Sequence, residues 1–89
     1  MKIPKQIQIA GKVIDVKFVE DLGESNGCAK LEECVILLEK NIAPQMQEEA
    51  FLHELMHFIF VIGGEETLGE NERLVGLISE LFYQVVKQL

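Results

Sequence analysis

The segment that most limits how this chain folds is residues 45–62, which is apolar on nearly every side. Pro44 suits a first helical position, where a missing N–H is harmless, and Gly63-Gly64 is a typical helix stop. The sequence therefore predicts a helix over about residues 44–62. Because a helix that is apolar all round is buried on most sides, we expect other elements to cover it on more than one face.

A single polar seam interrupts this helix and contains His53, Glu54 and His57, which include the only two histidines of the chain. Residues four apart lie nearly above one another on a helix, so both imidazoles can reach one Zn²⁺ at about 2.0–2.1 Å. The histidines share a face that points away from the main core. The expected core face of the helix holds Leu52, Leu55, Ile59 and Ile62.

The spacing His-Glu-x-x-His on a helix has a direct chemical meaning. Zinc lowers the pKa of a bound water towards roughly 7, and a neighbouring carboxylate can take the proton as the water attacks a carbonyl. Glu54 is therefore the candidate general base. The simpler alternative is that His53 and His57 are ordinary core or surface residues paired with nearby acids.

A tetrahedral catalytic site needs a third protein ligand, and a second helix can supply it. Thr67-Leu68-Gly69-Glu70 has the pattern of a capping box, and apolar residues recur at helical spacing after it, which predicts a helix over about residues 68–87. If the two helices are antiparallel, Glu72 lies level with His57, at ~1.5 Å per residue. The small Gly76 and Ser79 would let the two faces approach closely.

Glu72 is therefore the expected third ligand, and its alternative role is that of a solvated acid favoured by the helix dipole. Glu80 lies roughly two turns beyond the histidines, and Tyr83 is expected to serve packing. Cys28 and Cys34 offer another possibility, because with the histidines they could form a closed Cys₂His₂ structural zinc module. Against this, Cys34 lies inside an apolar strand pattern, where a cysteine usually acts as a small buried residue.

The N-terminal half predicts strands. Residues 6–9 and 12–19 read as a hairpin turning at Ala10-Gly11, Ser25-Asn26-Gly27 reads as a turn, and residues 33–39 read as a further strand. The fold class expected is α+β. A small, mainly antiparallel sheet from about residues 5 to 40 packs on the first helix, and the second helix runs antiparallel to it.

Taken together, the strand before the helix, the run from Phe51 to Phe58 and a Glu opening a following apolar helix resemble the zincin metallopeptidases. The chain is most similar to small gluzincin-like proteins of phages and mobile elements, and more distantly to ImmA/IrrE-type metallopeptidases. The resemblance covers about residues 33–86. It implies hydrolysis of peptide bonds, with zinc on His53, His57 and, less directly, Glu72, and with Glu54 as the base.

In zincins the strand before the active-site helix commonly lines the cleft and can hold an extended peptide by edge pairing. The long C-terminal subdomain of larger zincins has no counterpart among these 89 residues. A catalytically inactive, zincin-like metal-binding or interaction protein is therefore the alternative to an enzyme. The intact Glu54 favours the enzyme, because a purely structural site needs no base.

Length and charge limit the domain organisation and the kinds of binding partner that this chain can have. With 89 residues, 48% of them hydrophobic, we expect residues 1–89 to form a single zincin-like domain. Fifteen acidic and eight basic residues give a net charge of −7, which argues against nucleic acid and for a peptide or protein substrate. No apolar run is long enough for a membrane span, and two cysteines without a secretion signal favour the cytoplasm.

Overall fold

Strands and helices follow one another in the order the α+β prediction requires. In the computed structural model, which describes all 89 residues, the strands are β1 (Gln6–Ile9), β2 (Lys12–Val19), β3 (Gly27–Lys30) and β4 (Val35–Glu39). The helices are α1 (Pro44–Ile62), α2 (Glu66–Gly69) and α3 (Glu72–Val86). The predicted fold class, a mainly antiparallel N-terminal sheet followed by helices, is confirmed.

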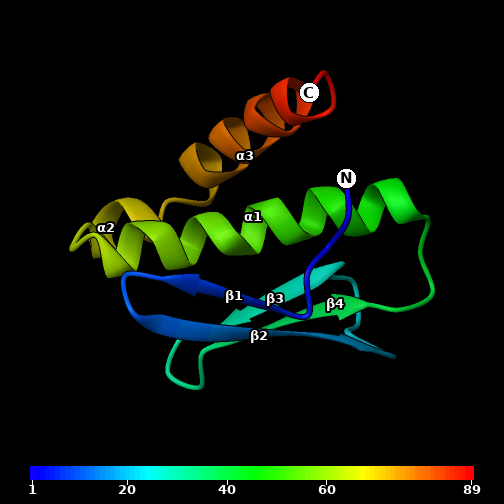
Figure 1. The fold of residues 1–89 in the computed structure, drawn as a ribbon, viewed down its shortest axis with the longest axis horizontal. Coiled ribbons are helices and arrows are strands. Elements are labelled where there is room, and N and C mark those ends of the chain that lie inside the picture. Colours follow the sequence, from blue (N-terminus) through cyan, green and yellow to red (C-terminus); the bar gives the residue numbers. More distant parts are fainter.

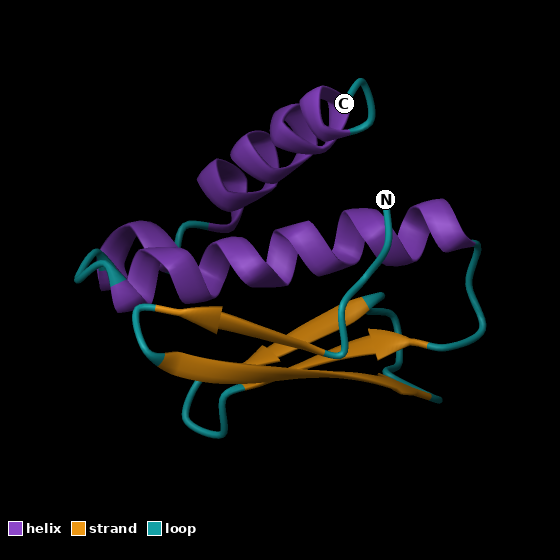
Figure 2. Cartoon of the chain, viewed as in Figure 1, coloured by secondary structure: helices purple, strands orange, loops and turns teal.

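The sheet consists of two antiparallel hairpins joined side by side. β1 pairs with β2 and β3 pairs with β4, while β2 and β4 are parallel, so that the spatial order is β1-β2-β4-β3. The first hairpin turns at Ala10 and Gly11, both with positive φ. All helices lie on one side of the sheet, and its other face carries none (Figure 2). The strand order makes β3 an edge strand and β4 an interior strand.

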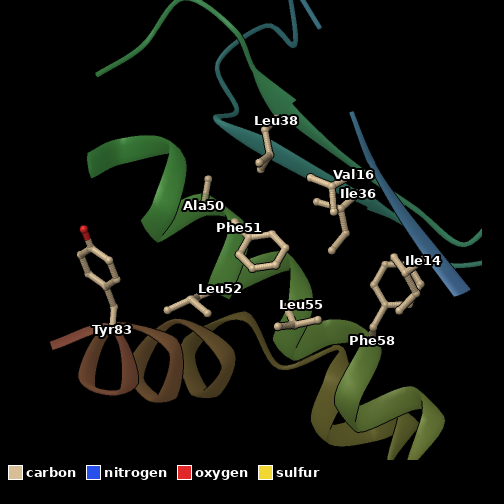
Figure 3. Packing of buried hydrophobic residues seen from close by; sticks show 10 residues of the cluster. All are labelled: Ile14, Val16, Ile36, Leu38, Ala50, Phe51, Leu52, Leu55, Phe58 and Tyr83. Carbon is tan, nitrogen blue, oxygen red and sulfur yellow. The ribbon is translucent and has the colours of Figure 1, made fainter. Parts of the chain in front are cut away.

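Alternation along the central strands builds one apolar face. Ile14 and Val16 of β2 and Ile36 and Leu38 of β4 are buried, because side chains two apart point to the same side of a strand. Figure 3 shows these side chains directed at the apolar residues of α1. The core cluster is completed by Ala50, Phe51, Leu52, Leu55 and Phe58 of α1 and by Tyr83 of α3.

Helix α1 forms the middle layer of the molecule. It lies between the sheet and α3, which packs on the side of α1 away from the sheet (Figure 1). This position explains why the segment is apolar nearly all round. Leu52 and Leu55 are buried as expected, but Ile59 is 40% exposed, so the prediction that it lies in the core is wrong. None of the helices is both long and apolar enough to cross a membrane.

Two predictions about the strands are wrong. The segment predicted as a turn at Ser25-Asn26-Gly27 leads directly into the unpredicted strand β3, which begins at Gly27. Four residues of the types Gly, Cys, Ala and Lys carry no alternation of apolar and polar character. The last strand begins at Val35 rather than at residue 33, because Cys34 has a φ of 54° in the left-handed region and belongs to the turn before β4.

The start of the last helix also differs from the prediction. Thr67 and Glu70 form no capping box, since residues 66–69 make the separate short helix α2, which has no side-chain cap. Helix α3 begins at Glu72, and the side-chain oxygen of its N-cap residue Asn71 accepts a hydrogen bond from the Leu74 N–H at 3.0 Å. Helix α1 ends as predicted, with Gly64 in the left-handed conformation at φ 83°.

Replacing Asn71 should therefore reveal which residue caps the helix. We expect Asn71→Ala to lower the free energy of unfolding by about 1 kcal/mol, because one N–H of the first turn loses its acceptor. Thr67→Ala is the matched control and should have little effect. Chemical denaturation of both variants measures this, and a larger loss in Thr67→Ala would mean that the capping box forms in solution.

Candidate metal centre

The antiparallel packing of α3 on α1 brings three side chains with metal-binding atoms together. Glu72 contacts His57 at the start of α3, Gly76 faces His53 one turn later, and Tyr83 donates a hydrogen bond to Glu48 further on. A Cβ on Gly76 would lie 3.9 Å from Cε1 of the His53 ring, which is an ordinary contact, so the approach of the two helices does not require glycine at this position. Tyr83 is buried and serves packing, as expected.

Both histidines present Nε2 to the same carboxylate. The distances are 3.0 Å from His53 Nε2 to Glu72 Oε2 and 2.9 Å from His57 Nε2 to Glu72 Oε1. One ligand atom from each of the three residues lies within 4.8 Å of the others. Two atoms that are each about 2.0–2.1 Å from a tetrahedral zinc ion are about 3.3 Å apart, so the two separations between a histidine nitrogen and a Glu72 oxygen are close to those of a zinc site.

The hydrogen bond on the far side of His57 fixes which nitrogen is free. Nδ1 of His57 lies 2.7 Å from the carbonyl oxygen of Gly69, and because a carbonyl can only accept, Nδ1 must carry the proton. In the neutral ring, Nε2 then holds a lone pair that faces the Glu72 carboxylate, which also only accepts. Two acceptors at 2.9 Å need a cation or a proton between them, so the three side chains suit a metal ion.

Glu54 lies beside the three possible metal ligands but is not one of them. Its half-buried carboxyl has a raised pKa, mainly because burial disfavours the charged form, whereas the nearby histidines act in the opposite direction. Glu72 raises this pKa further, and the backbone of Ala29 lowers it. A carboxylate whose pKa is shifted towards neutrality is a better proton acceptor than an ordinary surface glutamate.

Strand β3 lies directly against Glu54. Gly27 is buried, and a Cβ at this position would be 3.1 Å from Cγ and 3.3 Å from Oε2 of Glu54. A side chain at this position would therefore displace the Glu54 carboxylate by a few tenths of an ångström. The edge of β3, from Gly27 to Ala29, forms one wall of a hollow of about 340 Å³ whose other wall carries the four polar side chains of the centre, His53, Glu54, His57 and Glu72.

The strand that lines the hollow is not the expected one. We predicted that the strand before the active-site helix, which is β4, would offer its edge to a peptide. β4 has β2 on one side and β3 on the other, so its backbone groups are already paired. The free edge beside the centre belongs to β3, a strand that the sequence does not predict.

The two cysteines do not join the cluster. Cys28 is opposite Leu37 in the register of β3 and β4, and Leu37 lies between Ile36 and Leu38, which face α1. The Cys28 side chain therefore points to the other face of the sheet. Cys34 packs against the core, and its Sγ is 3.9 Å from the Leu31 carbonyl oxygen. Both thiols are free, and the cluster of possible metal ligands contains neither.

Two glycines have roles at the centre that the sequence does not predict. The sequence pattern places Gly69 in a capping box, whereas its carbonyl orients His57 and its buried Cα packs on α1. The pattern places Gly27 in a turn, whereas it makes room for Glu54. A glycine signals a tight turn and a close contact equally well, and only the spatial neighbours decide between them.

Gly69→Ala tests the support of His57. A Cβ on Gly69 would be 3.2 Å from Cβ of Phe60, so α2 must shift and carry the carbonyl away from Nδ1. We expect zinc affinity to fall by about 10- to 100-fold, as for other groups that orient a ligand. Gly76→Ala is the control, because its Cβ meets only an ordinary contact, and it should keep the affinity. Competition with a chromophoric chelator measures both; equal affinities would remove Gly69 from the account.

Comparison of the chain with protein-family models, with curated proteins and with solved structures gave no match.

Proposed function

We propose that this chain is a zinc-dependent peptidase of the zincin type. The observation that supports the proposal is the arrangement of four side chains in one hollow. The possible ligand atoms of His53, His57 and Glu72 lie close together, and the Glu54 carboxylate lies beside them without belonging to that group. A structural metal site has no use for a half-buried carboxylate next to its ligands. In a hydrolytic site, such a carboxylate can serve as the base for the attacking water.

The chemistry follows from these positions. Bound to the three side chains, zinc would supply the Lewis acidity that makes water a nucleophile near neutral pH. Glu54 takes a proton from the attacking water on a carboxylate oxygen and returns it to the leaving amine nitrogen. The Gly69 carbonyl holds His57 in the tautomer that leaves Nε2 free, and Gly27 and Ala29 hold the Glu54 carboxylate in place.

The substrate is proposed to be a peptide or protein segment that lies extended along β3. The free edge of β3 runs past Glu54, and main-chain groups on such an edge can pair with a peptide backbone. Binding through the backbone suits a substrate class without a single fixed side chain. The free thiols agree with a cytoplasmic location, which is part of the same proposal.

Metal removal and return test this function. The purified protein is incubated with a mixed peptide library as isolated, after treatment with a chelator, and after addition of one equivalent of zinc. We expect cleavage products in the first and third samples and none in the second. If the chelated sample still produced cleaved peptides, hydrolysis would not depend on the metal, and the proposed function would be wrong.

A second candidate function is a zincin-like metal-binding protein without turnover, which acts by binding a partner. The composition of the hollow favours it, because its lining contains no lysine, arginine or tyrosine that could stabilise the developing oxyanion. Zinc would have to supply that stabilisation alone. Zinc binding without cleavage of any library peptide would select this candidate.

A further inference from the structure

A second hollow lies next to the candidate metal centre, where strand β3 ends. It has a volume of about 320 Å³ and shares Leu31 with the hollow that contains the centre. Gly69, whose carbonyl oxygen accepts the hydrogen bond from His57, is also part of its wall. This Leu31 hollow is lined by Leu31, Glu32, Val61, Glu66, Gly69 and Glu70. A peptide that follows β3 past Glu54 would therefore reach it next.

The lining of the Leu31 hollow combines apolar surface with acidic groups. Leu31, which is 39% exposed, and the half-buried Val61 provide the apolar part. Glu32, Glu66 and Glu70 are exposed, and none of the ion pairs in the structure involves them. No lysine or arginine lines this hollow or the hollow of the centre. A well-matched occupant therefore offers both an apolar part and a positive charge.

We propose that the Leu31 hollow is a specificity subsite for a lysine or arginine side chain of the peptide substrate. The inference rests on the proposed binding of a peptide along β3. Lysine and arginine have a long apolar stem and a charged head, so the stem can cover Leu31 and Val61 while the head stays in water beside the carboxylates. An acidic side chain would be repelled from the same place, which gives the subsite its selectivity.

The distance along β3 gives the position of this residue in the substrate. Glu54 lies against Gly27 and the backbone of Ala29, and Leu31 is four residues after the first and two after the second. At about 3.3 Å per residue, this separation is roughly 7–13 Å. The lysine or arginine should therefore lie about two to four residues from the bond that is cleaved, always on the same side of it.

Peptide selection on an inactive variant tests the subsite without turnover. Zinc-loaded Glu54→Gln is incubated with a mixed library of short peptides, and the bound peptides are sequenced. We expect lysine and arginine to be enriched by roughly 8-fold at one position, because each of three exposed carboxylates contributes about a factor of two. Adding Glu66→Gln and Glu70→Gln to this variant removes two of the three charges and should reduce the enrichment to about 2-fold.

The matched control adds Glu20→Gln and Asp21→Asn instead. These two acids are also exposed, and their removal changes the net charge equally, but they do not line the Leu31 hollow, so the enrichment should persist. No bound peptide, no cationic preference, or a preference that both sets of changes reduce equally would overturn the subsite. Cleavage is measured separately on the unaltered protein, so peptides that bind with this preference but are never cut would count against the proposed function alone.

Shortening the cationic side chain tests the apolar part of the subsite. In a selected peptide, the lysine is replaced by 2,3-diaminopropionate, which keeps the ammonium group but lacks three methylenes of the stem. We expect binding to weaken by roughly 10-fold, because these methylenes no longer cover Leu31 and Val61. Equal affinity of the two peptides would mean that only the charge attracts them, and it would contradict a subsite with an apolar wall.

Discussion

Zinc affinity should fall by more than about 100-fold when Glu72 is replaced by alanine, because a first ligand contributes more than the groups that orient it. Its two carboxylate oxygens lie 3.0 Å and 2.9 Å from Nε2 of His53 and His57, and no other carboxylate takes part in the cluster. Isothermal titration or chelator competition with the purified variant gives the affinity. Helix α3 should remain folded, since the Glu72 side chain is 69% exposed.

The double replacement of Cys28 and Cys34 by serine is the matched control for this prediction. Cys28 faces the side of the sheet away from α1, and Cys34 lies in a turn, so zinc affinity should not change. If the cysteine variant lost the metal while Glu72→Ala kept full affinity, a closed Cys₂His₂ module would be correct. The packing of α3 on α1 would then be wrong as well.

Peptide hydrolysis should fall by at least ~10²-fold in Glu54→Gln, while zinc binding and folding are retained. The amide has the size of the carboxylate and still fits against Gly27, but it accepts no proton at neutral pH. Activity on a mixed peptide library and zinc content should be measured on the same preparation. Unchanged cleavage by the glutamine variant would remove Glu54 from the mechanism.

A second variant separates the position of Glu54 from its charge. Gly27→Ala keeps the carboxylate but adds a Cβ that would be 3.1 Å from Cγ of Glu54. We expect a loss of activity with zinc still bound, in the same direction as Glu54→Gln and smaller. Full activity in Gly27→Ala would mean that the base does not need the support of β3.

The parts of the fold that the sequence predicts well are those with local signals. Pro44 and the Gly63-Gly64 pair limit α1 at the predicted residues, and alternation gives β2 its predicted bounds. β3 was missed because its four residues have neither alternation nor branched apolar side chains; pairing with β4 and contact with α1 hold it in place. The predicted start of α3 is wrong because Thr67 and Asn71 are both good cap residues, and in the structure it is the Asn71 side chain that accepts the hydrogen bond from the Leu74 N–H.

Helix geometry alone predicts which side chains come together at the candidate site. A turn of four residues puts His53 beside His57. A short connection to an antiparallel helix puts Glu72 near both, although Glu72 is the first residue of α3 and not the fifth of a longer helix as predicted. The contributions of Gly69 and Gly27 come from the backbone and from the absence of a side chain, which leave no chemical signature in a sequence.

X-ray absorption at the zinc edge of the protein loaded with one equivalent of metal tests the central claim most directly. We expect the zinc to be bound by two imidazole nitrogens at about 2.0–2.1 Å and otherwise by oxygen, from Glu72 and solvent, with no sulfur. A sulfur shell at about 2.3 Å, the distance of a zinc–thiolate bond, would contradict it and place the metal on Cys28 or Cys34 instead.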